Sequence, residues 1–244
     1  MIIDPANHDA AQNYKFLIGS ILPRPIAWVS TRSVDGVDNL APVSFFTAAG
    51  RKPPRVHLSL QARADGETLK DTFVNIRDTK EFVVNLAVLP LAHEVHRSAF
   101  EFDTGVDEFE MLNVAKEQCE VVKPPRVKES PISFECVLFH IFGGEGSNDH
   151  AVWGEVVRCH IRDDLYLDNG RIDTAAIPVI GRLAAEYTLV NNTFTTPLDD
   201  SVRAAYHGRR MQRLDDHPDG FSPIDTSAWS PSGATRNEER GHDH

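Results

Sequence analysis

The feature that most constrains the fold is a pair of strand-like segments with a proline inside the second one. Residues 26–32 mix β-branched, aromatic and small hydroxyl side chains, and residues 39–47 form the second segment. Between them, Ser33-Val34-Asp35-Gly36 has turn composition, with Gly36 able to take a positive φ. Because proline donates no ladder hydrogen bond, Pro42 excludes a central strand there. The sequence therefore predicts a hairpin whose second strand is an edge or a bulge, with backbone groups free for another partner.

Other segments extend this pattern to a mainly β fold with peripheral helices. The stretch from Ile132 to Phe142 alternates between two faces, and residues 143–150 supply the hairpin loop for a returning strand. Asn85 interrupts an apolar strand, so its amide must bond either to backbone or to a polar ligand. The predicted strands cover residues 55–60, 81–89, 132–142 and 151–161, and the predicted helices cover residues 9–21, 68–77 and 90–100.

The predicted helix over residues 68–77 starts with residues that suit an anion. Thr68 is the expected N-cap, which places Lys70, Asp71 and Thr72 in the first turn. Free N–H groups, the helix dipole and a lysine together favour a negative charge there. A solvated charged helix face is the alternative, and the spacing alone does not decide between the two.

Charge and cysteine content narrow the classes of protein. The formal net charge of −11 argues against sequence-independent binding of nucleic acid or anionic lipid but allows a small basic pocket for one phosphate. No run of apolar residues has the length of a membrane span. Cys119, Cys136 and Cys159 form no Cys-x-x-Cys pair, which favours a reducing, cytoplasmic location. His93 and His96 are three apart on a predicted helix but lack a third ligand, so we predict no metal site.

Several ordered motifs closely resemble the flavin reductase-like family of FMN-binding split-barrel proteins. The similarity spans roughly residues 15–190 and implies a split β-barrel with bound flavin. It departs from the family pattern at Ala184 and Ala185, which replace the usual glycines after a late leucine and could narrow the pocket. The motifs are residues 24–31, residues 39–46, Pro53-Pro54, Lys70-Asp71-Thr72 with Asn75, and residues 81–86.

The resemblance implies a role for each part of an FMN site. The phosphate would meet Lys70, Thr72, Ser44 and Thr31, and the isoalloxazine edge would meet the backbone of residues 41–43. The ring face would lie against an aromatic wall from Trp28, Phe45 or Phe46, and His150 in the hairpin loop is the candidate catalytic residue. The full cofactor-binding set is Trp28, Ser30, Thr31, Ala41, Pro42, Val43, Ser44, Phe45, Lys70, Asp71, Thr72 and Asn85.

The implied activity is hydride transfer from NADH or NADPH to the flavin, and from there to oxygen, a partner monooxygenase or an electron-carrier protein. The family resemblance also implies a homodimer. Two alternatives remain open at this point: a flavin-binding electron carrier without turnover, and a pyridoxamine-phosphate-type split barrel of the same architecture.

The end of the chain differs in composition from the rest. Thr196-Pro197-Leu198-Asp199 has the pattern of a helix start, and the predicted helix runs to about Leu214. From Asp215 onward, polar residues, glycine and proline predominate, which predicts an extended tail. We therefore expect a split-barrel domain over residues 1–195, followed by a C-terminal helix and tail over residues 196–244.

Overall fold

The computed structural model describes residues 1–143 and 148–191. One compact unit spans Met1–Asn191. The predicted C-terminal helix and tail lie outside the described residues, as does part of the loop 143–150. The domain division at residue 195 therefore stays a prediction.

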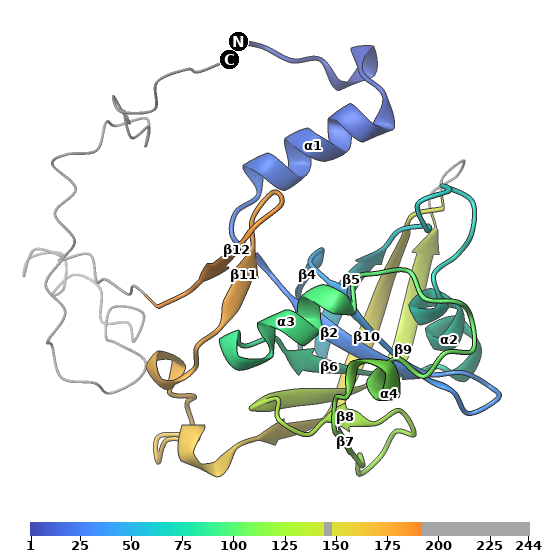
Figure 1. Ribbon diagram of the computed structural model, residues 1–244. Helices are drawn as coiled ribbons and strands as arrows, with labels where there is room; N and C mark the ends of the chain where they lie inside the picture. Colours follow the sequence, from blue (N-terminus) through green and yellow to red (C-terminus); the bar gives the residue numbers. More distant parts are fainter. Residues whose placement is uncertain (144–147, 192–244) are drawn as a thin grey trace, which may run out of the picture. The chain divides into compact units, whose positions relative to one another are not determined.

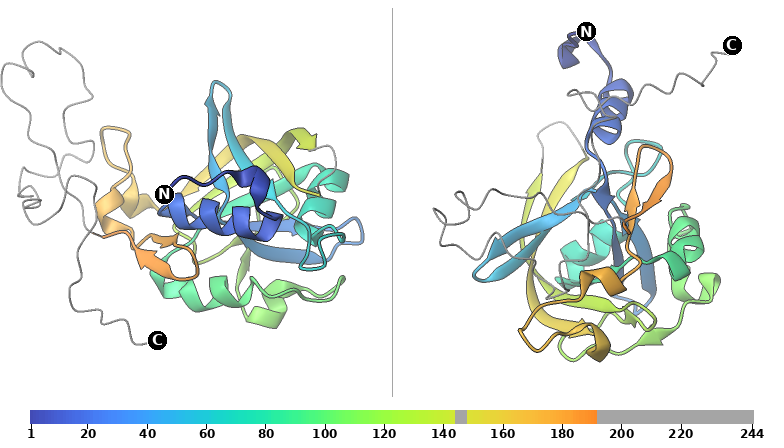
Figure 2. Two further views of the ribbon diagram at one scale, coloured as in Figure 1. Left: turned by 90° about the horizontal axis from the view of Figure 1, so that it is seen from above. Right: turned by 90° about the vertical axis from the view of Figure 1, so that its left-hand side faces the viewer.

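The fold is a mainly β split barrel, as predicted. Seven strands build its main sheet: β2 (Ala27–Arg32), β3 (Asp38–Val43), β4 (Phe46–Arg51), β5 (Pro54–Leu60), β6 (Glu81–Leu86), β9 (Ile132–Gly143) and β10 (His150–Ile161). They pair antiparallel in the order β3-β2-β6-β9-β10-β5-β4. Figures 1 and 2 show this sheet curving into an open barrel, with β3 and β4 as its two edges.

Short elements surround the barrel. Two small sheets are built from β1 (Arg24–Pro25), β11 (Ile180–Arg182) and β12 (Tyr187–Leu189), and from β7 (Lys116–Glu117) and β8 (Arg126–Val127). The α-helices are α1 (Ala10–Ser20), α2 (Asp71–Thr79), α3 (Ala92–Arg97) and α4 (Glu108–Leu112). The 3-10 helices are η1 (Pro5–Asn7), η2 (Leu89–Leu91), η3 (Asp163–Leu165) and η4 (Thr174–Ala176). Among the described residues, no helix is both long and apolar enough to cross a bilayer.

Strand β2 lies at the centre of the hydrophobic core because both of its faces are buried. Ala27 and Val29 pack into the barrel interior with Phe82. Trp28 points the opposite way and packs with Leu40 under α3 and α4. This alternation along one strand creates two apolar clusters, and β3 runs along the boundary between them.

The proline-containing hairpin has the predicted form. Gly36 takes φ +88° in the turn, and β3 pairs with β2 on one side while its other side is a sheet edge. Leu40 directs its backbone N–H outward, because that group bonds to a side chain of α4 and not to β2. Pro42, two residues later, lies on the same outward side, where its missing N–H costs no ladder bond.

The helix that carries Lys70 begins later than predicted. Thr68 bonds to Asp65 through its hydroxyl (2.5 Å) and its backbone N–H (2.8 Å), which forms a turn and not a helix cap. Helix α2 starts at Asp71, and Lys70 is its N-cap without a side-chain capping bond. Lys70 therefore precedes the first turn, whereas Asp71 and Thr72 lie within it.

Two peripheral segments differ in how they are anchored. Helix α1 forms over the predicted residues, but none of its residues is buried. Figures 1 and 2 show α1 standing away from the sheet. The acidic stretch 101–113, by contrast, contains helix α4, from which Phe109 is fully buried. Asp107 caps the start of α4 by accepting from the Glu110 N–H (3.2 Å).

Candidate functional site: a pocket along the β3 edge

A pocket lies along the exposed edge of β3, between the two apolar clusters. Its walls come from the end of β5 and the start of α2 on one side, and from the segment after α3 on the other. The lining residues are Tyr14, Asn39, Ala41, Pro42, Val43, Ser44, Phe45, Ser59, Leu60, Gln61, Arg63, Lys70, Asp71, Thr72, Ser98, Ala99, Phe100, Glu101, Phe102 and Glu108. Eight of the twelve predicted cofactor-binding positions therefore lie here: residues 41–45 and residues 70–72.

The floor of the pocket is backbone. Successive residues of an edge strand point their N–H and C=O groups alternately toward the neighbouring strand and toward the open side. Since Leu40 points outward, the Pro42 carbonyl does so as well, without an N–H beside it. This edge offers backbone hydrogen-bonding groups to a flat ligand with a polar edge.

One end of the pocket is suited to an anion. The first amides of α2, those of Asp71 and Thr72, have no acceptor within the helix. The Lys70 side chain has no hydrogen bond or ion pair with any described residue, whereas Arg63 pairs with Asp71 at 2.9 Å. Asn39 donates to the Thr72 hydroxyl at 3.0 Å and fixes its position. At this end of the pocket, Lys70 is thus the cation that remains able to bind a ligand anion.

The other end is held by a buried arginine. Arg24 is 3% exposed and donates to the carbonyls of Ile18 and Leu183, each at 2.6 Å, and to the Ser44 hydroxyl at 3.3 Å. These bonds join α1 and the β11–β12 hairpin to the pocket. Tyr14 of α1 approaches Phe45, with ring centroids 6.0 Å apart.

Four of the predicted cofactor-binding residues lie in the core and not in the pocket. Trp28, Ser30, Thr31 and Asn85 are all fully buried on the central strands. Trp28 donates to the Ser98 hydroxyl (2.8 Å), Ser30 donates to the Pro125 carbonyl (2.5 Å), and Thr31 accepts from Asn75 (3.0 Å).

Asn85 shows why these positions are unavailable to a ligand. Its amide nitrogen donates to the Trp28 carbonyl and the Ser30 hydroxyl, and its oxygen accepts from the Val127 N–H and the Ser133 hydroxyl. Its donors and its acceptor are thus used inside the protein, by backbone groups and by two serine hydroxyls, and not by a ligand.

His150, the predicted catalytic residue, is also placed differently from expectation. It is the first residue of β10, paired with Leu60 and Gly143, and not a free loop residue. Its ring stacks on Phe73 with centroids 4.0 Å apart, and its Nδ1 is buried without a hydrogen-bond partner. It is not among the residues that line the pocket, so the geometry gives it no contact with a ligand there.

Sequence reasoning missed Arg24, Arg63 and Glu108. Arg24 bonds to neutral oxygens far along the chain, so no charge pattern could reveal it. Glu108 lies in an acidic stretch whose composition is typical of an exposed surface segment. Ala184 and Ala185 are exposed in the turn between β11 and β12, so their methyl groups do not narrow this pocket. Within residues 1–143 and 148–191, no three His, Cys, Asp or Glu side chains gather as metal ligands.

Comparison with known proteins decides the family. A model described as the flavin reductase like domain matches residues 18–176. This chain belongs to the flavin reductase-like family. The resemblance seen in the sequence is thereby confirmed, and the chain is placed among flavin-related oxidoreductases.

Individual relatives agree with this family membership. A protein of Aquifex aeolicus is 38% identical over 174 residues, covering 71% of this chain and 87% of that protein. The crystal structure of nitrilotriacetate monooxygenase component B from Bacillus cereus superimposes with a TM-score of 0.76 at 32% identity, covering 80% of this chain and 98% of that one. A protein with a split barrel domain from Shewanella frigidimarina has the same fold, with a TM-score of 0.69 at 21% identity, covering 82% of this chain and 100% of that one.

Proposed function

We propose that this protein is an FMN-dependent oxidoreductase of the flavin reductase type. It would take hydride from NADH or NADPH and pass the electrons to an acceptor such as oxygen or a partner monooxygenase. The proposal rests mainly on one observation: the open β3 edge and the start of α2, with its unpaired Lys70, line the same pocket. A ring with a polar edge and a phosphate on a flexible linker is the ligand shape that matches both.

The residues present fit FMN in their chemistry. Lys70 and the first α2 amides would hold the phosphate, and the Pro42 carbonyl with the backbone of residue 44 would meet the polar ring edge. When bound, the flavin supplies the redox chemistry by accepting hydride at N5, so the protein needs no acid or base for that step. The chain's own task is to orient the ring and leave one face open to a nicotinamide.

Spectroscopy tests this proposal directly. We expect the purified protein to bind FMN and show flavin absorbance, and stopped-flow mixing with NADH or NADPH to bleach it. A protein that binds FMN but is bleached by neither nicotinamide would be an electron carrier. A protein that does not bind FMN would refute the proposal. The family match already argues against the alternative ligand, a pyridoxamine phosphate.

The first prediction concerns Lys70. We expect Lys70→Ala to raise the Kd for FMN by roughly 5- to 150-fold, because a charge-assisted hydrogen bond to phosphate contributes about 1–3 kcal/mol. Fluorescence titration measures the effect. Lys128→Ala is the matched control, since Lys128 is exposed and does not line the pocket. Equal affinity in Lys70→Ala and wild type would remove Lys70 from the phosphate site.

The homodimer is also a proposal, and the outer face of the barrel supports it. His140, Trp153 and His57 are cross-strand neighbours on β9, β10 and β5, on the face opposite the buried row of Leu58 and Val152. Phe139 and Phe142 add exposed aromatic surface beside them, at 48% and 50% exposure. In a two-fold dimer, this face of one subunit would pack against the same face of the other subunit.

The second prediction tests that face. We expect Phe139→Glu to convert a dimer into a monomer of 27.2 kDa in sedimentation equilibrium, because a carboxylate would be desolvated in the interface. Arg55, 3.6 Å from the Phe139 ring, can neutralise the new charge within the isolated subunit. Val34→Glu is the control, since Val34 is 74% exposed on the turn before β3. A dimer that survives Phe139→Glu contradicts this assignment.

In line with the cysteine pattern, we propose a cytoplasmic location. Cys119, Cys136 and Cys159 are all free thiols. Burial raises the pKa of Cys119 to about 12, so this thiol stays protonated and unreactive at neutral pH.

A further inference from the structure

Glu108 is a buried carboxyl in the pocket wall. It is 7% exposed, and its Oε2 accepts from the Leu40 N–H at 2.6 Å. The other acids at this part of the pocket are each matched: Asp71 pairs with Arg63 at 2.9 Å, and exposed Glu101 accepts from the Ala64 N–H. Among the described residues, Glu108 has no ion pair. Burial, partly opposed by the Leu40 hydrogen bond, raises its pKa to about 7.

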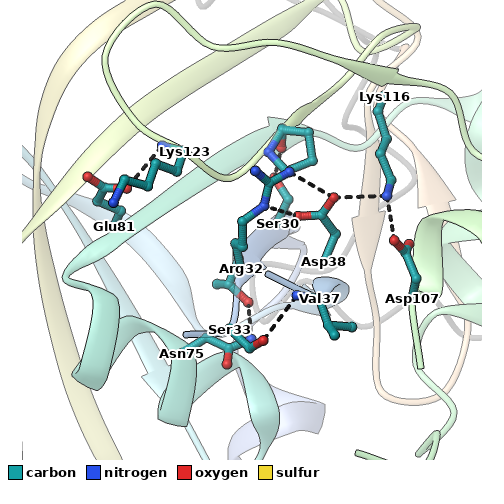
Figure 3. A network of polar contacts seen from close by, with 12 residues as sticks. Ser30, Arg32, Ser33, Val37, Asp38, Asn75, Glu81, Asp107, Lys116 and Lys123 are labelled. Atoms are coloured by element: carbon teal, nitrogen blue, oxygen red, sulfur yellow. Dashed lines mark hydrogen bonds and ion pairs between the residues drawn. The ribbon is translucent and has the colours of Figure 1, made fainter. Parts of the chain in front are cut away.

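An ionic network holds Glu108 in this position. Asp38 accepts from Arg32 at 2.6 and 3.0 Å and pairs with Lys116 at 2.8 Å, and Lys116 also bonds to Asp107 at 2.5 Å (Figure 3). Asp107 is the N-cap of α4, so the network fixes the start of the helix and with it the next residue, Glu108. Within the network, the negative charges of Asp38 and Asp107 are matched by the positive charges of Arg32 and Lys116. Neither cation is therefore left to pair with Glu108.

The placement of Glu108 relates it to the anion end of the pocket. Asn39 and Leu40 are consecutive on β3, and they bond to Thr72 and Glu108 respectively. Glu108 and Thr72 are therefore held at consecutive positions of the same strand, and both line the pocket. An anion held by Lys70 and the first α2 amides shares the pocket with this carboxyl. An ionised Glu108 would repel it in a setting where water screens little.

We propose that Glu108 is part of the phosphate site in its neutral form and takes up a proton from solvent when a phosphate monoester binds. The protonated carboxyl can donate a hydrogen bond to the ligand, which the carboxylate cannot. Asp71, Arg63 and Asp107 act electrostatically on Glu108. Lys70 and Glu101 line the same pocket, and Lys116 pairs with Asp107 at the start of α4. Of these, the Asp71 and Asp107 carboxylates disfavour ionisation of Glu108, and Arg63 favours it. This inference rests on the proposed flavin function.

The test compares FMN with riboflavin, which lacks the phosphate, for wild type and Glu108→Gln between pH 6 and 8.5. For wild type, we expect the affinity for FMN to fall above about pH 7, approaching tenfold per pH unit, while the affinity for riboflavin stays level. Glu108→Gln keeps an acceptor for the Leu40 N–H, and we expect it to bind FMN with little pH dependence over the same range. Glu101→Gln is the control and should retain the wild-type slope.

Calorimetry of the wild-type protein in two buffers of different ionisation enthalpy provides a second measurement that needs no variant. We expect FMN binding near pH 8 to take up close to one proton, and riboflavin binding to take up none. No proton uptake, or the same slope in wild type and Glu108→Gln, overturns the inference. If neither flavin binds even at pH 6, it is the proposed function that fails.

Discussion

Replacing Glu135 by alanine should lower the free energy of unfolding by about 3–5 kcal/mol, because the side chain organises a buried polar cluster. Glu135 is 0% exposed. Its Oε1 accepts from the Glu120 N–H (2.8 Å) and from His160 Nε2 (2.5 Å), and its Oε2 accepts from the N–H groups of Val121 (2.7 Å) and Val122 (2.9 Å). Alanine would leave these donors without an acceptor.

The pH dependence of this effect has a definite sign. Burial alone would raise the pKa of Glu135, but the bonds from His160 and from three backbone amides outweigh it and lower the pKa below 4.5. A lowered pKa in the folded state stabilises the protein above the unfolded-state pKa, and this stabilisation is lost as the pH falls through the folded value. The deficit of Glu135→Ala should therefore be largest near pH 7 and shrink below about pH 4.

Urea unfolding followed by tryptophan fluorescence measures the change. Glu129→Ala is the control, since Glu129 is exposed and its replacement should change stability by less than about 0.5 kcal/mol. Glu135→Gln separates charge from packing, because glutamine retains one acceptor oxygen. If Glu135→Ala unfolds at the wild-type urea concentration, the cluster does not stabilise the fold.

The sequence predicted those parts of the fold that depend on local chemistry. The Pro42 edge and the Gly36 turn follow from proline geometry and positive φ, and both are present. The two-residue alternation predicted along β9 holds only as far as Leu138, because the register shift opposite Trp153 and Gly154 leaves Phe139 as an extra residue, and Ile141 then packs on the same side as Leu138. The start of α2 was misplaced because Asp65, three residues earlier, competes for the Thr68 hydroxyl and amide. A capping pattern alone does not show which of two local hydrogen bonds forms.

The candidate site was predicted in part, for a related reason. The structure brings residues 41–45 and 70–72 together in one pocket, at the β3 edge and the α2 start. Trp28 and Asn85 carry equally suitable side chains but belong to strands buried on both faces, where neighbours distant in sequence bind them. A strand period tells which residues share a face and does not tell whether that face meets a ligand or the core.

Gly154→Ala should be the most damaging substitution of a glycine in the described barrel. A Cβ at this position of β10 would lie 2.2 Å from Cζ and 2.6 Å from Cε1 of Phe82, and 3.3 Å from the Cβ of Cys136. Phe82 is 0% exposed within the barrel interior, so its ring has no free space to enter. Because overpacking forces side chains off their rotamers and shifts backbone, we expect a loss of about 3 kcal/mol.

A double-mutant cycle shows whether the collision with Phe82 is the cause. Phe82→Leu alone should destabilise by creating a cavity, but combined with Gly154→Ala it should cost less than the sum of the two, because the smaller side chain makes room for the methyl group. Gly50→Ala is the control, since its Cβ would meet nothing closer than 3.4 Å. Thermal unfolding of the two single variants, the double variant and the control measures each change in stability relative to wild type. Strict additivity would show that Gly154 is required for another reason, such as the register shift of β9 against β10 between Trp153 and Gly154.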